Sequence, residues 1–145
     1  MIIISNVKPD LICCILSTMI DQPHWRRLLL RSEKAASEYE EAIKNRVPGS
    51  GCNLCNDHDS ILQEFSHFVL MKNKFPYDRY FTKSDMLVSK RHAAEQELTP
   101  EERTEFISIK RELSDSYDSI IEHLPKQKSI PDHFHVHIIE FKRPE

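Results

Sequence analysis

Residues 132–139 read Asp-His-Phe-His-Val-His-Ile-Ile, so three histidines alternate with apolar residues. Strict alternation is typical of a half-buried β-strand, because successive side chains of a strand point to opposite faces of the sheet. We expect the apolar residues to enter a core and the histidines to line the other face at intervals of roughly 6.6 Å, two strand rises. The apolar residues are Phe134, Val136 and Ile138, and the histidines are His133, His135 and His137.

A row of imidazoles on a strand suits two kinds of chemistry. One is metal coordination, and the other is nucleophilic or acid–base work on an anion such as phosphate. An exposed face that is merely rich in histidine is the alternative. The whole chain has 8 histidines in 145 residues, so three alternate positions filled by histidine favour a functional site.

Four further motifs precede these histidines. They are Cys-Asn-Leu-Cys at 52–55, Asn-Lys-Phe-Pro-Tyr-Asp at 73–78, Met-Leu-Val-Ser-Lys-Arg-His at 86–92 and Leu-Thr-Pro-Glu-Glu at 98–102. In this order, and followed by the alternating histidines, they resemble the motifs of the histidine triad family of nucleotide-binding proteins. The resemblance covers residues 50–141 and implies a hydrolase or nucleotidyl transferase. Its substrate would be a nucleoside phosphoramidate or a dinucleoside polyphosphate, attacked at the α-phosphate.

The chain departs from the family pattern at three places. Ser84 stands where many members carry histidine, and Ser89 stands where proline is usual. The glycine-rich run before the histidines is missing, and the whole chain contains only two glycines. A phosphate cradle made of glycine backbone is therefore excluded, and side chains must supply the phosphate contacts. The nearest candidates are Lys126, Lys128 and Ser129.

The resemblance assigns catalytic roles to three residues. His135, the middle histidine, would attack the α-phosphate and form a nucleotidyl-histidine intermediate. A neutral imidazole is a good nucleophile near pH 7, provided that its other nitrogen is held as a donor, for example by a backbone carbonyl. His137 would stabilise charge on the phosphate oxygens. Ser129 would contact the phosphate or the leaving group.

The nucleotide pocket is expected elsewhere in the chain. The resemblance places the base and the ribose near Asn73, Phe75 and Asp78, where an acidic side chain can accept the ribose hydroxyls and an aromatic ring can flank the base. Lys128 and His137 would complete the substrate contacts. A simple packed turn at residues 75–77 is the alternative.

Cys52 and Cys55 have the spacing that lets two sulfurs reach one zinc ion from a tight turn. A redox pair is the rival interpretation. The resemblance supplies His92 and His133 as the two further ligands of a structural zinc site. His58 is a substitute ligand, but it is better explained as a surface loop residue. The remaining histidines, His24, His67 and His123, belong to no constellation and are interpreted as structural.

Two other function classes stay open. In the first, the three alternating histidines themselves bind a catalytic zinc whose water attacks the substrate, which would leave Cys52 and Cys55 without a role. In the second, the chain is a non-catalytic nucleotide-binding or interaction module with a structural zinc.

Bulk properties narrow the choice of partner and compartment. The net charge of −3 gives no positive field for nucleic acid or an anionic membrane, so a small nucleotide is the expected partner. The longest apolar stretch, residues 11–20, is about half of the ~20 residues that a membrane span needs. Four cysteines in two close pairs, 13–14 and 52/55, indicate a reducing, cytoplasmic environment. The resemblance also implies a homodimer.

The fold class predicted is α+β, an antiparallel β-meander with one main packing helix and an N-terminal helical extension. The extension comprises residues 1–48 and the nucleotide-binding domain residues 49–145. Strands are expected at 65–71, 85–89, 117–122 and 133–141. The main helix should begin with a capping box of Thr99, Pro100 and Glu102 and bury a stripe made by Phe106, Ile109 and Leu113.

In the extension, apolar residues recur at helical spacing over residues 23–45, with Pro23 in the first turn. This helix contains no obvious convergent polar group, so residues 1–45 are predicted to be dispensable for the chemistry. Its apolar stripe, which includes Trp25, Leu28, Leu29 and Ile43, must nevertheless be covered by the domain or by a second copy of the chain.

Overall fold

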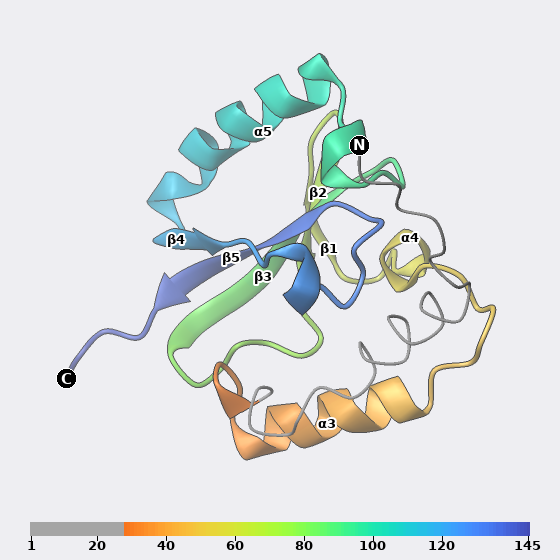
Figure 1. Ribbon diagram of the computed structural model, residues 1–145. Coiled ribbons are helices and arrows are strands. Elements are labelled where there is room, and N and C mark those ends of the chain that lie inside the picture. The colour runs from red at the N-terminus through yellow and green to blue at the C-terminus, as the bar shows by residue number, and fades with distance from the viewer. Residues whose placement is uncertain (1–27) are drawn as a thin grey trace, which may run out of the picture.

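A computed structural model of the chain describes residues 28–145 and has an α+β fold (Figure 1). One antiparallel sheet contains five strands in the order β1-β2-β3-β5-β4. The strands are β1 (Ile61–Glu64), β2 (Phe68–Lys72), β3 (Phe81–Ser89), β4 (Ser119–Ile121) and β5 (His135–Phe141). The helices are α3 (Glu33–Lys44), α4 (Asn53–Asn56) and α5 (Pro100–Glu112), with short 3-10 turns η1 (Glu95–Glu97), η2 (Leu113–Asp115) and η3 (Pro125–Gln127).

The predicted α+β class is confirmed, and the meander comprises β1 to β3. β5 returns beside β3 and pairs with it over seven positions, among them Val88 with His135 and Met86 with His137. β4 then forms the edge next to β5. This arrangement places His137 between two paired strands and His135 beside β3, and His133 lies just before β5.

The main helix begins as the sequence predicts. The Thr99 hydroxyl accepts the backbone N–H of Glu102, and the Glu102 carboxylate accepts the N–H of Thr99. Ile109 and Leu113 are buried, and Phe106 is partly buried beside them. They pack on alternate residues of the central strands, including Phe134, Val136 and Ile138. The expected core face of the histidine strand is therefore confirmed.

The opposite face of the sheet carries the histidines. Figure 1 shows α5 along one side of the sheet and α3 along the other. On the α3 side, Val69, Met71 and Val88 form a smaller apolar cluster. On the neighbouring strand, Val88 pairs with His135 and Met86 pairs with His137.

The predicted helix over residues 23–45 is not continuous. α3 begins at Glu33, because the hydroxyl of Ser32 caps it by accepting the N–H of Ala35. Leu28 is helical, and residues 29–31 form a turn and a bend before this cap. The N-terminal part of the predicted helix, residues 23–27, lies outside the described residues, as do the apolar stretch 11–20 and the cysteines at 13 and 14.

All four predicted strands differ from the structure at their boundaries; β4 is shorter than the predicted 117–122, and β5 begins at His135 rather than at residue 133. β2 begins at Phe68 rather than at Phe65, because residues 65–68 form a turn closed by the bond from the Phe65 N–H to the Phe68 carbonyl (2.8 Å). The Glu105 carboxylate accepts the backbone N–H groups of Ser66 and His67 in that turn. β3 begins four residues earlier than predicted, at Phe81, and β1 was not predicted at all.

The N-terminal segment packs on the domain. Both carboxylate oxygens of Asp78 accept bonds from Ser32, one from its N–H (2.7 Å) and one from its hydroxyl (2.6 Å). Leu30 contacts the cluster of Tyr77, Phe81 and Ile139. Within residues 28–145, no helix has the length and apolar character needed to cross a membrane.

Stability should depend strongly on the α5 face. We expect Ile109→Ala to lower the free energy of unfolding by about 2–5 kcal/mol, because it leaves a cavity in the core. Ile107→Ala is the matched control, since Ile107 lies on the same helix with 55% of its surface exposed, and it should change stability by less than about 0.5 kcal/mol. Urea denaturation of both variants measures the difference, and equal losses would contradict this packing.

Candidate functional site

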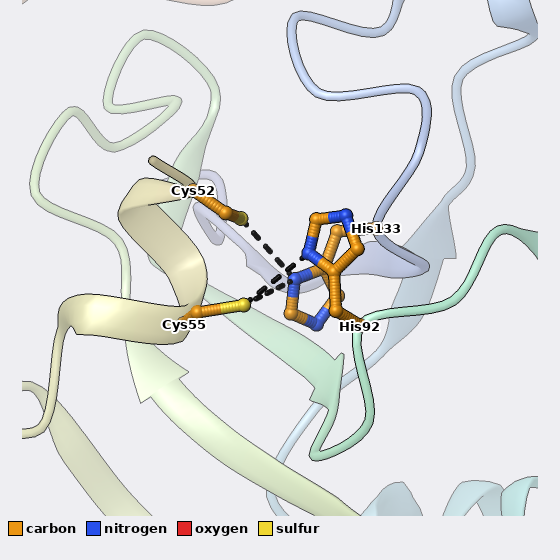
Figure 2. A group of neighbouring side chains, drawn as sticks. All are labelled: Cys52, Cys55, His92 and His133. Atoms are coloured by element: carbon orange, nitrogen blue, oxygen red, sulfur yellow. Dashed lines mark hydrogen bonds between the residues drawn. The ribbon is translucent and has the colours of Figure 1, made fainter. Parts of the chain in front are cut away.

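Two cysteines and two histidines converge from distant parts of the chain (Figure 2). Their ligand atoms all lie within 4.8 Å of one another. The Nδ1 atom of His133 lies 3.3 Å from the Cys52 sulfur and 3.4 Å from the Cys55 sulfur, and the Nδ1 atom of His92 lies 3.3 Å from the Cys55 sulfur. In a tetrahedral zinc site, sulfur and nitrogen ligands are separated by roughly 3.5 Å, so the spacing fits a single metal ion.

The outer contacts of the two histidines also fit a metal site. Histidine ligands usually donate their second ring N–H to a carbonyl or carboxylate. Here Nε2 of His133 donates to the carbonyl of Ser89 (2.7 Å), and Nε2 of His92 lies 3.2 Å from the Asp132 carboxylate. The Nδ1 atom of each ring then has a free lone pair, which it could donate to a metal ion held between the rings and the sulfurs.

Each ligand is held by a different local structure. Cys52 is the N-cap residue of α4, and Cys55 lies within that single turn of helix. His92 follows β3, where Arg91 forms a two-pronged ion pair with the buried Glu102 at the start of α5 (3.0 and 2.8 Å). The helix and the strand end are thus tied together beside the cluster.

The thiols are free, and no disulfide joins Cys52 and Cys55. Burial raises the pKa of the Cys55 thiol, and a hydrogen bond with Cys52 raises it further. The thiolate form therefore needs a cation beside it, which a metal ion supplies. His58, the substitute ligand considered from the sequence, is exposed and is not part of the cluster.

His135 is oriented by the backbone of its own strand. Its Nδ1 donates to the carbonyl of His133 (2.8 Å), which leaves Nε2 with the free lone pair. Burial lowers the pKa of His135, and the charge of Lys128 adds to this effect. The side chain is therefore a neutral imidazole near pH 7, with the tautomer that a nucleophile requires.

A second group of rings surrounds His137. The Tyr77 hydroxyl lies 3.0 Å from Nε2 of His137 and 2.6 Å from Nε2 of His123. Burial, followed by the charges of His135 and His123, lowers the pKa of His137 well below its usual value. Its Nδ1 atom is buried and has no partner among the described residues.

The prediction that His123 belongs to no group of functional side chains was wrong, because His123 contacts Tyr77 and His137. It lies between β4 and η3, its ring packs edge-to-face on that of His137 (centroids 5.4 Å apart), and the Tyr77 hydroxyl contacts both rings. No local pattern marks it. The same applies to Tyr77, whose segment was otherwise explained as a packed turn.

A cavity of about 530 Å³ opens over this face of the sheet. Most of the predicted substrate and catalytic residues line it, namely Asn73, Phe75, Lys128, Ser129, His135 and His137. Asn73 is buried, and its side-chain nitrogen has no hydrogen-bond partner among the described residues. Lys128 is 7% exposed, with its ammonium 4.0 Å from the Glu122 carboxylate.

Asp78 is the exception among the predicted substrate residues. It does not line the cavity, and both of its carboxylate oxygens are engaged by Ser32. These bonds lower the pKa of Asp78 against the opposing effect of burial. Its observed role is to anchor the start of α3, so the predicted contact with a ribose is not what the structure supports.

The prediction that the N-terminal helix lacks convergent polar groups was wrong. Arg31, Tyr39 and Arg46 line the cavity from the α3 side. Arg31 precedes the helix, and its Nε donates to the carbonyl of Phe75 (3.0 Å). The sequence offers no signal for this, since an arginine near a helix start is usually a solvated residue.

Comparison with known protein families finds no matching family model, and comparison with curated proteins finds no significant match. The site is therefore interpreted from its own geometry. Within the described part of the chain, the only triad histidine that joins the metal-ligand cluster is His133. His135 and His137 face the cavity, so a metal held by all three histidines is not what this geometry supports.

We expect the protein purified without chelators to contain about one metal ion per chain. Cys55→Ser should abolish metal binding and lower the melting temperature, because metal binding and folding are coupled. His58→Ala is the matched control and should change neither quantity, since His58 is exposed three residues further along. Elemental analysis and thermal unfolding measure both effects. Protein without metal, or a Cys55→Ser variant as stable as the parent, would contradict the site.

Proposed function

We propose that this chain is a nucleotide hydrolase or nucleotidyl transferase of the histidine triad type. Its substrate would be a nucleoside phosphoramidate or a dinucleoside polyphosphate, cleaved at the α-phosphate. The observation that carries the proposal is the state of His135, a neutral imidazole whose Nδ1–H is bound to the His133 carbonyl and whose Nε2 is free at a large cavity.

The chemistry follows from that geometry. Nε2 of His135 attacks the α-phosphorus, a phosphorus–nitrogen bond forms, and the bond to the leaving group breaks with its electron pair. The Ser129 hydroxyl lies at the cavity to contact the leaving group, and the buried Lys128 ammonium offsets charge on the phosphate oxygens. Water then attacks the nucleotidyl-histidine and restores the free imidazole.

The cavity also suits a nucleoside. Phe75 and Tyr39 are in edge-to-face contact, with ring centroids 5.4 Å apart, and present aromatic surface to the cavity. The unpartnered nitrogen of Asn73 is a donor that a buried ligand oxygen would satisfy. Asn73, Phe75 and Lys128 keep the substrate-binding roles proposed for them.

We assign zinc to the cluster of Cys52, Cys55, His92 and His133. Two thiolates and two imidazoles are a ligand set that selects zinc, and four protein ligands close the coordination sphere, as in structural sites. The ion would act on the chemistry through His133, which would both ligate it and hold His135 in its tautomer.

The catalytic proposal is tested with an adenosine phosphoramidate. The intact chain should release AMP, and His135→Asn should lower kcat/KM by at least about a thousandfold while the melting temperature and AMP binding stay close to the parent. His67→Asn is the matched control, because His67 is an exposed histidine near α5 and away from the cavity, and it should retain full activity.

Mass spectrometry of acid-quenched reactions should find the nucleotidyl adduct on His135. An adduct on any other residue would overturn the assignment of the nucleophile. Binding of the phosphoramidate without turnover would instead identify the chain as a non-catalytic nucleotide-binding module.

A further inference from the structure

Arg31 belongs to the predicted N-terminal extension, yet its side chain lines the cavity of the predicted nucleotide-binding domain. Its guanidinium carbon lies 4.3 Å from the centroid of the Tyr39 ring and 4.6 Å from that of the Tyr77 ring. Its Nε–H is bound to the carbonyl of Phe75. The guanidinium is therefore oriented by two aromatic rings and one backbone carbonyl.

No carboxylate neutralises this cation within residues 28–145, since none of the ion pairs there involves Arg31. The guanidinium lines the same cavity as the histidines. A partly buried arginine that is oriented by two rings at a cavity wall, with no carboxylate partner among residues 28–145, is suited to a two-pronged contact with an anion such as phosphate.

Two cations flank successive histidines of β5. Lys128 lines the cavity together with His135, whereas Arg31 lies over the Tyr77 ring, whose centroid is 4.4 Å from that of the His137 ring. The His135 and His137 rings are 5.9 Å apart. If one phosphate of a phosphate chain lies beside His135 and Lys128, the next phosphate of the chain would lie beside His137 and Arg31.

We propose that Arg31 binds the phosphate group that follows the one attacked by His135, and that the substrate carries a chain of at least two phosphates. The inference rests on the proposed function and selects nucleoside polyphosphates from the two substrate classes named there. It also makes the N-terminal segment part of the active site, in place of a dispensable extension.

The segment is anchored firmly enough to serve this role. The Arg79 side chain donates to the carbonyl of Leu28 (2.7 Å), and the Arg79 N–H donates to the carbonyl of Leu30 (3.1 Å). Ser32 on the other side of Arg31 is bound to Asp78. Backbone on both sides of Arg31 is therefore fixed to the domain.

The test compares AMP and ADP binding to the intact chain by isothermal titration calorimetry. ADP should bind about ten- to a hundredfold more tightly than AMP, the scale of hydrogen bonds to a charged group. Arg31→Gln should remove this preference and leave AMP affinity within about threefold. Lys34→Gln is the matched control, because Lys34 is an exposed cation three residues away that does not line the cavity, and it should keep the preference.

Kinetics give a second readout. Arg31→Gln should lower kcat/KM for a diadenosine polyphosphate by about ten- to a hundredfold and leave that for an adenosine phosphoramidate within about threefold. Equal affinities of the parent chain for AMP and ADP, or equal losses for both ligands in Arg31→Gln, would overturn the role of Arg31 and leave the proposed function standing. Absence of any nucleotide binding or turnover by the parent chain would overturn both.

Discussion

One residue, His133, connects the metal-ligand cluster to the histidine that faces the cavity. Its Nδ1 points at the sulfurs of Cys52 and Cys55, its Nε2–H is bound to the carbonyl of Ser89, and its own carbonyl accepts the Nδ1–H of His135. The side chain can satisfy both contacts only in one rotamer and one tautomer. Anything that holds the His133 ring in the cluster therefore also holds the backbone carbonyl that orients His135.

The sheet gives this connection its rigidity. His135 and His137 lie in β5, where both residues pair with β3 and His137 also pairs with β4, so the sheet restrains their backbone. Because side chains alternate, the residues between them enter the core under α5. A slip of one residue in the β3–β5 pairing would expose Val136 and Ile138 and bury the histidines against α5. The large apolar core thus fixes the direction in which the imidazoles point.

Features encoded locally in the sequence could be predicted, and features made by distant contacts could not. The alternation of residues 133–138, the Thr99 capping box and the Cys52/Cys55 spacing each act within one turn or strand, and the structure bears out the elements they predict. The pairing of Cys52 and Cys55 with His92 and His133 came from the family resemblance, and the structure brings these four residues together.

The cluster of Tyr77, His123 and His137 has a different origin. Its members come from three separate parts of the chain, and sequence spacing carries no information on their meeting. The start of α3 also depends on a distant partner. Helical spacing continues before Glu33, but Asp78 binds both polar groups of Ser32 and makes that residue the cap. The same bonds give Asp78 a structural role at the start of α3.

The difference between the two helices that cover the sheet explains why one face is a core and the other a cavity. α5 presents Ile109, and η2 adds Leu113, so large side chains fill the space above the strands. The buried residues of α3 are Ala35 and Ala36. On this side of the sheet Arg31 and Tyr39 line the cavity, and the Arg31 guanidinium lies over the Tyr77 ring. Polar and aromatic side chains thus border the space on the α3 side, whereas apolar side chains fill the space under α5.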